Sequence, residues 1–459
     1  MKKKKPVAGA FSALGKDLRE IGTTFVKGDW KTKISFLIMG FGPILRGQIV
    51  KGLAFLAAEI LFFVYLFGFG LQYLSKINTL GTVETQKIHR HTVYGDNSFL
   101  ILLFGILTIV IIAAIILVWR MNVRENFVEE KKLREGKTLP SNKKALASLL
   151  DENFDKTLMA LPMLGVFVFT VLPIIFMVCV AFTNYDATHQ SPTNLFTWVG
   201  LDNFKNLFSF GSNGFGKTFG TVLSWTLVWA FFATFIDYFV GLAVAMLINK
   251  KGIRFKKVWR TILVVTIAVP QFVSLLYVSK MFDNDGIVNG FLMRIGLIDS
   301  YIPFWQDPLL AKVMIILINI WIGIPYMMLI ATGLLMNIPE DLYESAKIDG
   351  ANPGQMFRHI TLPYMLFVTG PFLLTQFTGN LNNFNVIYLL SGGGPQSLKL
   401  TGNAGHTDLL VTWLYKMTVN DTDYKMAAVI GIMVFIVVAV VTLSVYNLLP
   451  SVKDEEGFQ

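Results

Sequence analysis

Eight long apolar runs dominate this sequence and decide what it can fold into. Each matches or exceeds the ~20 residues that an α-helix needs to cross the hydrocarbon core of a bilayer. None alternates apolar and polar residues over about ten positions, as a strand of a membrane barrel would. The runs therefore predict an all-α, polytopic membrane protein with about eight transmembrane helices. We place the spans at 52–74, 99–119, 157–183, 219–248, 258–281, 312–336, 366–391 and 426–449.

The composition supports this fold class, because hydrophobic residues make up 54% of the chain and charged residues only 15%. A soluble domain carries about 25% charged residues, so a water-soluble globule is nearly excluded. The single cysteine, Cys179, excludes a disulfide within the chain. One further apolar stretch, 34–50, is short and is interrupted by Gly42, Pro43 and Arg46. We expect it to lie on the membrane surface or to re-enter it, with a ninth span as the alternative.

Lysine and arginine counts set the orientation of the spans. The connecting segments fall into two alternating sets, of which one holds 28 of these residues and the other only 9. The segment 337–365 is weakly charged, but the alternation places it in the basic set. Cytoplasmic loops carry the excess of Lys and Arg, so both termini are predicted to be cytoplasmic. The net charge of +10 is explained in the same way and does not point to nucleic acid. The basic set comprises 1–51, 120–156, 249–257, 337–365 and 450–459.

Residues 211–218 fit the phosphate-loop pattern G-x-x-x-x-G-K-[ST] letter for letter. A phosphate loop follows a buried strand and works with an acidic, magnesium-binding strand elsewhere. Here a membrane span follows the motif, and the loop is predicted to face away from cellular ATP. No βαβ pattern occurs in the chain. We interpret the motif as a chance match, and we expect no catalytic residue, no metal site, no cofactor and no enzymatic activity in this chain.

The cytoplasmic segment 337–363 carries strong helix signals outside the spans. Asn337 can cap a first short helix, and Gly350 can end it. Asn352 and Pro353 restart the chain as a second helix, which Pro363 limits. A short, rigid helix with small residues on one face suits a groove of another protein. A simple connector is the alternative.

The same segment resembles the EAA loop of ABC importer permeases. The resemblance runs from Glu344-Ser345-Ala346 through Gly350 to the Ile-Thr-Leu-Pro run at 360–363. Ser345 stands where the family has Ala, and both residues are small. In that family the loop is a coupling helix seated in the ATPase subunit. The resemblance implies ATPase-coupling roles for Glu344, Ser345, Ala346, Asp349, Gly350, Leu362 and Pro363.

Further motifs are similar to carbohydrate-importer permeases, and most of all to the larger permease of maltose/maltodextrin importers. These motifs lie at 200–208, 323–328, 382–384, 389–395 and 404–411.

This resemblance covers about 157–449 and implies a six-helix permease core. Residues 1–156 are then an N-terminal cytoplasmic or interfacial segment with two spans and a charged linker, and 450–459 are a cytoplasmic tail. The outer loop at 184–218 is short, whereas the Gram-negative relatives carry a large folded insertion there. The short loop implies a binding protein tethered by lipid.

Span seven carries an unusual set of carboxamides. Gln376, Asn380 and Asn383 are spaced i, i+4, i+7, which places them on one face of a helix. Carboxamides both donate and accept hydrogen bonds, so they match sugar hydroxyls without adding charge. Polar residues within a membrane span are costly and point to function. The alternative is that these amides only join helices through interhelical hydrogen bonds.

The resemblance carries Tyr326, Asn380 and Asn383 onto positions that contact maltose in the family. It places Ile322 and Gly323 beside that site. Gln376 and Gly379 stand where the family has Ser and Phe, so the implied wall of the site is smaller and richer in amides.

Taken together, these features resemble those of a permease subunit of an ATP-driven importer of maltose and maltodextrins in a bacterial cytoplasmic membrane. The implied partners are a second homologous permease, two cytoplasmic ATPases that use ATP and Mg²⁺, an extracellular sugar-binding lipoprotein and membrane lipid. One alternative is a permease for galacto-oligosaccharides or raffinose-type sugars. Another is a stand-alone ion-coupled sugar transporter, which would need no EAA loop and would want more acids in its spans than Glu59 and Asp237.

Overall fold

The computed structural model describes residues 19, 21–88, 91–191, 193–211, 215–250 and 252–449. The regular secondary structure of the described part is helical apart from one hairpin of β1 (Gln86–Ile88) and β2 (His91–Val93). The chain divides into two compact units, Met1–Trp198 and Val199–Gln459. This division lies later than the predicted 156/157 boundary, so the third span packs within the first unit. The six-helix core at 157–449 stays a prediction.

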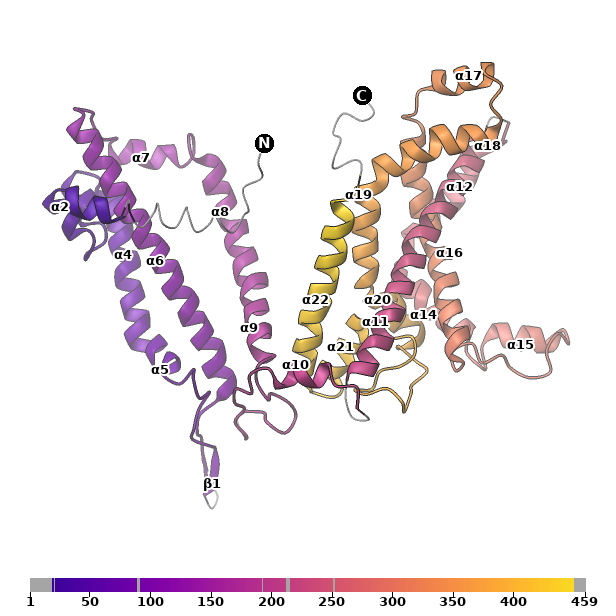
Figure 1. The fold of residues 1–459 in the computed structure, drawn as a ribbon, viewed down its shortest axis with the longest axis horizontal. Helices are drawn as coiled ribbons and strands as arrows, with labels where there is room; N and C mark the ends of the chain where they lie inside the picture. Colours follow the sequence, from indigo (N-terminus) through magenta and orange to yellow (C-terminus); the bar gives the residue numbers. More distant parts are fainter. Residues whose placement is uncertain are drawn as a thin grey trace. The chain divides into compact units, whose positions relative to one another are not determined.

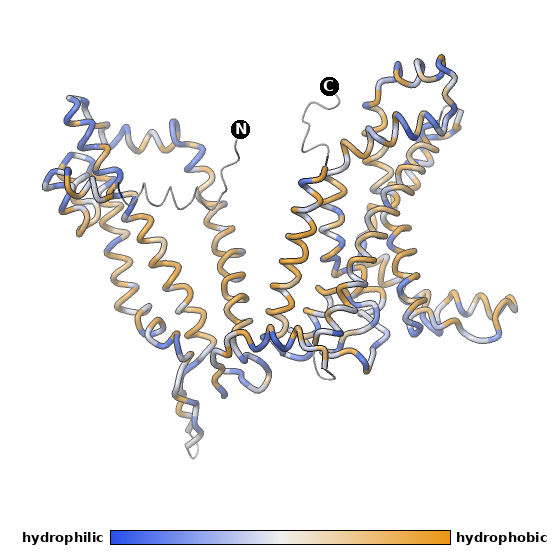
Figure 2. Tube along the Cα trace, viewed as in Figure 1, coloured by the Kyte–Doolittle hydropathy of each residue, from blue (hydrophilic) through white to orange (hydrophobic). Residues whose placement is uncertain are grey.

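Seven of the eight predicted spans are confirmed, and the fifth is present as a span if its bent pair of helices is counted as one. Seven helices are long and apolar enough to cross a membrane, and an eighth span is a pair of helices with a 91° bend between them. The hydropathy colouring follows these helices, with polar residues gathered at their ends (Figure 2). The seven are Ile49–Leu74, Ser98–Arg134, Phe154–Val180, Gly216–Asn249, Pro308–Leu335, Pro353–Leu381 and Tyr424–Tyr446, and the bent pair is Lys256–Ala268 with Gln271–Met281.

The first unit contains three spans. Two of them are interrupted by a wider, π-helical turn. The charged segment after the second span continues that helix to Arg134. The helices are α2 (Trp30–Ile34), α3 (Phe41–Leu45), α4 (Ile49–Tyr65), η1 (Leu66–Gly70), α5 (Leu71–Leu74), α6 (Ser98–Arg134), α7 (Asn142–Ser148), α8 (Phe154–Val166), η2 (Phe167–Val171) and α9 (Leu172–Val180).

The stretch 34–50 forms turns and the short helix α3 instead of a ninth span. Polar contacts to α6 hold it in place. The Gly40 N–H donates to Asn122 Oδ1 at 3.0 Å, and Arg46 donates to Asn126 Oδ1 at 2.8 Å. Arg46 also pairs with Asp29 at 2.7 Å. The alternative of a ninth span is therefore wrong, and the expectation of a surface-lying or re-entrant segment stays a prediction.

The second unit is a bundle with α17 and α18 at one end and α10, α15 and α21 at the other (Figure 1). Its helices are α10 (Asp202–Leu207), α11 (Gly216–Phe231), η3 (Phe232–Ile236), α12 (Asp237–Asn249), α13 (Lys256–Ala268), α14 (Gln271–Met281), α15 (Ile287–Arg294), α16 (Pro308–Leu335), α17 (Glu340–Ile348), α18 (Pro353–Met356), η4 (Phe357–Thr361), α19 (Leu362–Leu381), α20 (Phe384–Ser391), α21 (Leu410–Val419) and α22 (Tyr424–Tyr446).

Helices α12 and α16 approach each other closely because Gly241 has no side chain. A Cβ atom at Gly241 would lie only 2.4 Å from Cβ of Met327. Tyr238 and Met328 are buried in the same cluster of side chains. This close packing fixes the position of α16, which carries the residues of the candidate site.

The segment between spans six and seven differs from the prediction in two details. Helix α17 begins after Pro339, so the prediction that Asn337 caps it is wrong. The chain restarts at Asn352 as predicted, and Asn352 forms a capping box with Gln355 at the start of α18. Pro363 does not end that helix, which continues through η4 into α19. The wide turn η4 lies just before Pro363 and accommodates a residue that has no N–H and a bulky ring.

Span seven is broken where the prediction had a continuous helix over 366–391. Helix α19 ends at Leu381, and α20 begins at Phe384 with Asn383 as its N-cap. The side-chain oxygen of Asn383 accepts from the N–H of Val386 at 3.3 Å. The predicted helical stripe therefore ends at Asn380, because Asn383 lies beyond the break.

Candidate functional site

A cavity of 330 Å³ lies between the bent fifth span and α16. The bend falls at Val269 and Pro270, between α13 and α14, and proline is a residue that kinks or breaks helices. Broken helices within a membrane are tolerated where they line a cavity. Apolar, aromatic and polar side chains share the lining. They are Thr266, Ile267, Val269, Pro270, Gln271, Ser274, Asn319, Trp321, Ile322, Gly323 and Tyr326.

Three residues that the resemblance singled out lie together in this cavity: Ile322, Gly323 and Tyr326. Asn319 was missed, although it lies four residues before Gly323 and seven before Tyr326 on the same helix face. That spacing could have revealed it. Gln271 was missed too, because its position in the cavity depends on the bend in span five. Contact of any of these residues with a sugar stays a prediction.

Asn380 and Asn383 do not line this cavity. Asn380 donates from Nδ2 to Thr234 Oγ1 on η3 at 3.0 Å, and Asn383 donates to Asn380 Oδ1 at 3.3 Å. Asn380 thus makes the interhelical hydrogen bond of the alternative interpretation. Gln376 and Gly379 lie on α19 before the break, and Gly379 is exposed with open space where a side chain would be.

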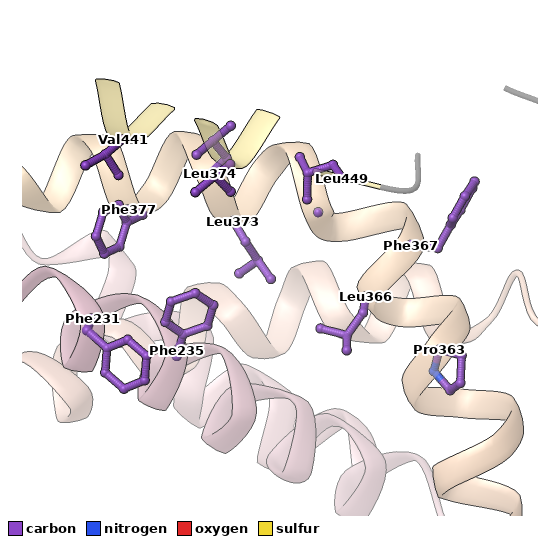
Figure 3. Close-up of a pocket in the computed structure, with 12 residues that line it drawn as sticks. Phe231, Phe235, Pro363, Leu366, Phe367, Leu373, Leu374, Phe377, Val441 and Leu449 are labelled. Carbon is purple, nitrogen blue, oxygen red and sulfur yellow. The ribbon is translucent and has the colours of Figure 1, made fainter. Parts of the chain in front are cut away.

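A larger hollow of 730 Å³ lies along α11, η3, α19 and α22 (Figure 3). Its lining is apolar throughout, with Phe235, Leu373 and Phe377 around its middle and no polar side chain pointing into it (Figure 3). A sugar hydroxyl buried there would lose its hydrogen bonds to water without replacement. The smaller polar cavity is therefore the better candidate for a sugar.

The predicted coupling residues lie at the end of the bundle formed by α17 and α18 (Figure 1). Glu344 and Ser345 are exposed on α17, and Ala346 is half-buried. Asp349 follows the helix end, and Gly350 takes a left-handed conformation with φ of +81°. The hydroxyl groups of Tyr343 and Thr361 lie 2.8 Å apart and join α17 to η4. Leu362 and Pro363 open α19.

Residues 237–454 match the family described as "Binding-protein-dependent transport system inner membrane component". The chain is 34% identical to the maltodextrin transport system permease protein MalC of Streptococcus pneumoniae serotype 4 over 435 residues, which cover 93% of this chain and 97% of that protein. The chain belongs to this family of transport permeases. The permease is thus a multi-pass protein of the cytoplasmic membrane.

Two further comparisons also match the chain to proteins of ABC-type sugar transport. The permease is 37% identical to the galactooligosaccharides transport system permease protein GanP of Bacillus subtilis over 423 residues, covering 91% of this chain and 97% of GanP. A crystal structure of a bacterial ABC transporter for the import of alginate includes a chain with the same fold. The TM-score is 0.52 at 22% identity, over 66% of the permease and 97% of that chain.

A buried ion pair holds together the outer-loop motifs that carried the resemblance. Lys416 on α21 donates to Asp408 Oδ2 at 2.7 Å, and the Gly405 N–H donates to the same oxygen at 2.7 Å. Thr412 donates to Asp408 Oδ1 at 2.9 Å. Burial raises the pKa of the Asp408 carboxyl, although all these partners favour its charged form. Gly393 is required here, because a Cβ atom on it would lie 1.8 Å from Asp408 Oδ1.

The phosphate-loop match lies at the start of α11, with 212–214 outside the described residues. Thr218 is buried, and its hydroxyl oxygen accepts from the N–H of Thr401 at 2.9 Å. That hydroxyl group therefore serves the packing of the outer loop. No strand of the described part precedes the motif in the way a phosphate loop requires.

Lys217→Ala is expected to leave sugar uptake within about twofold of the unchanged permease. Lys217 is exposed, and surface substitutions usually change stability by less than about 0.5 kcal/mol. The measurement is uptake together with ATP hydrolysis in the assembled transporter. Loss of ATP hydrolysis in this variant would show that the motif binds nucleotide after all.

Proposed function

We propose that the permease translocates maltose and maltodextrins across the bacterial cytoplasmic membrane, driven by separate ATPase subunits. One observation carries the proposal: a cavity of 330 Å³ with amide, hydroxyl and aromatic side chains lies at a broken span of a chain that belongs to the binding-protein-dependent permeases. Amides and hydroxyls exchange hydrogen bonds with sugar hydroxyls, and aromatic rings cover apolar faces. The likeness to MalC along nearly the whole chain supports maltodextrin as the substrate.

A second candidate substrate is a galacto-oligosaccharide, because GanP is as similar to this chain as MalC is. Both sugars present several hydroxyl groups and apolar ring faces to a transporter. The residues of the cavity suit either class, so competition between the two sugars has to distinguish them.

The proposed assembly contains a second homologous permease, two ATPases on the cytoplasmic side and an extracellular sugar-binding lipoprotein. The exposed helix α17 and the turn at Gly350 support docking of an ATPase. The short outer segment between α9 and α11 supports a binding protein tethered by lipid. In this proposal ATP and Mg²⁺ belong to the ATPases, and the permease itself catalyses no reaction and holds no cofactor.

Substitution of the implied sugar contacts tests the proposal. Tyr326→Ala, Asn380→Ala and Asn383→Ala are each expected to reduce uptake of labelled maltotriose about tenfold. Removing one partner of a buried hydrogen bond costs roughly 1–3 kcal/mol, and ~1.4 kcal/mol is a factor of ten. Asn447→Ala is the matched control, since this exposed amide follows the last span. Uptake is measured at equal expression, with unlabelled galacto-oligosaccharide as the competitor.

The three variants also separate the cavity from the amide pair. A loss confined to Tyr326→Ala would place the sugar in the cavity alone and leave Asn380 and Asn383 with a packing role. Normal uptake in all three variants would contradict both assignments. Stronger competition by galacto-oligosaccharide than by unlabelled maltotriose would favour the second candidate substrate.

A further inference from the structure

A carboxyl group is buried in the middle of the fourth span. Asp237 follows the π-helical turn η3 and is only 4% exposed. An acid at this depth is costly unless it is paired, and acids inside spans are typically functional. π-Helical turns are frequent at functional sites as well. A functional role would explain why this span retains an acid whose burial is energetically costly.

The partner of Asp237 is a residue of the cavity. Asn319 Nδ2 donates to Asp237 Oδ2 at 2.9 Å, from α16 to α12. Asp237 Oδ1 is buried and has no hydrogen-bond partner among the described residues. In this contact the NH₂ group of Asn319 faces the carboxyl group. The amide oxygen of Asn319 is then the group that remains for another donor.

Gly323 provides the space for this contact. A Cβ atom at Gly323 would lie 2.2 Å from Asp237 Oδ2, so a side chain there would displace the carboxyl group. Gly323 and Asn319 are one turn apart on α16, and both line the cavity. The carboxyl group thus lies directly behind the face of α16 that borders the cavity.

Neighbouring residues show that this part of span four is fixed on several sides. Thr234, one turn earlier, accepts from Asn380 at 3.0 Å, and Tyr238 accepts from Thr369 at 3.0 Å. Both partners lie on α19. Asp237 is therefore held on a segment bonded at two points to α19 and cannot easily follow a movement of Asn319.

We propose that Asp237 is a positioning residue that fixes the carboxamide of Asn319, so that its oxygen accepts a hydrogen bond from a sugar hydroxyl in the cavity. This inference rests on the proposed function. It assigns Asp237 no contact with the sugar. The predicted result of removing Asp237 is a freely rotating amide and a weaker, less selective contact.

The test is a double-mutant cycle on the complete transporter in proteoliposomes. Asp237→Ala and Asn319→Ala are each expected to lower uptake of labelled maltotriose about tenfold, while ATP hydrolysis stimulated by sugar-loaded binding protein persists. The double variant should lose no more than Asn319→Ala alone, because interacting residues are not additive. Asp237→Asn keeps an acceptor oxygen and should recover most of the uptake. Thr378→Val is the matched control, since it removes an interhelical contact to Thr442 away from the cavity.

Each outcome decides the matter. Additive losses in the double variant, or no recovery in Asp237→Asn, would overturn the inference. If Asp237→Ala lowered both ATP hydrolysis and thermal stability, Asp237→Asn would take its place in the cycle. The double variant of Asn319→Ala and Asp237→Asn should then lose no more uptake than Asn319→Ala alone. If the unchanged permease imported neither maltotriose nor galacto-oligosaccharide, the proposed function would fail. If it imported maltotriose and the Asp237 variants did so equally well, only this inference would fail.

Discussion

A Gly350→Trp permease is expected to lose maltotriose uptake by well over tenfold, while the external binding protein still captures sugar. Gly350 has φ of +81° in the turn between α17 and α18. A residue with a side chain pays roughly 1–2 kcal/mol for this conformation, and the indole would project from an exposed surface. Both effects act on the segment that is predicted to seat in the ATPase.

The measurement separates coupling from folding. Uptake, recovery of the ATPase subunits with the permease, and sugar-stimulated ATP hydrolysis are compared at equal expression. Gly350→Asn should keep most of the activity, because asparagine tolerates the left-handed conformation. Gly296→Trp is the matched control, since Gly296 has φ of +70° and open space in the connection between α15 and α16, at the other end of the unit. Unchanged assembly and ATP hydrolysis in Gly350→Trp would contradict the coupling role.

A substitution of Glu344 tests the same predicted ATPase-docking surface as Gly350→Trp. Glu344 is exposed on α17, so Glu344→Lys changes the charge offered to a partner without removing a buried contact. We therefore regard it as a companion variant to Gly350→Trp, with the same measurements.

Most of the fold was predictable because length and hydropathy decide which segments cross a membrane. Seven spans appear where the apolar runs lie, and the remaining run forms the pair of helices that bends at Pro270. The turn at Gly350 and the cap at Asn352 were predictable for the same local reasons. Pro363 was misjudged because the π-helical turn before it lets the helix pass through.

The candidate site was less predictable, since it depends on contacts between distant segments. The pair of Asp237 and Asn319 joins positions 82 residues apart, and no local pattern signals it. The stripe through Asn380 and Asn383 assumed a continuous helix, whereas the chain breaks at Asn382. Tyr326 and Gly323 were found through resemblance, and their position in a cavity became visible only with the bent fifth span in place.

Asp408→Ala is expected to destabilise the permease by about 3–5 kcal/mol, because it leaves Lys416 buried without its ion partner. Lys416 is 5% exposed and Asp408 is fully buried, so water cannot replace the lost contact. The outer-loop motifs that meet around Asp408 should lose their arrangement, and uptake should fall with the folded fraction. The measurement is thermal unfolding of the purified complex together with uptake.

Two further variants make this expectation specific to the buried pair. Asp408→Leu combined with Lys416→Met should be more stable than either single change, since a well-packed apolar pair can replace a buried ion pair. Lys280→Ala is the matched control: it removes an exposed pair with Asp283 at 3.3 Å, and such pairs contribute about 0–1 kcal/mol. An Asp408→Ala permease as stable as the Lys280→Ala control would mean that the outer loop is held by its backbone contacts and by Trp225, which donates to the Thr407 carbonyl at 3.0 Å.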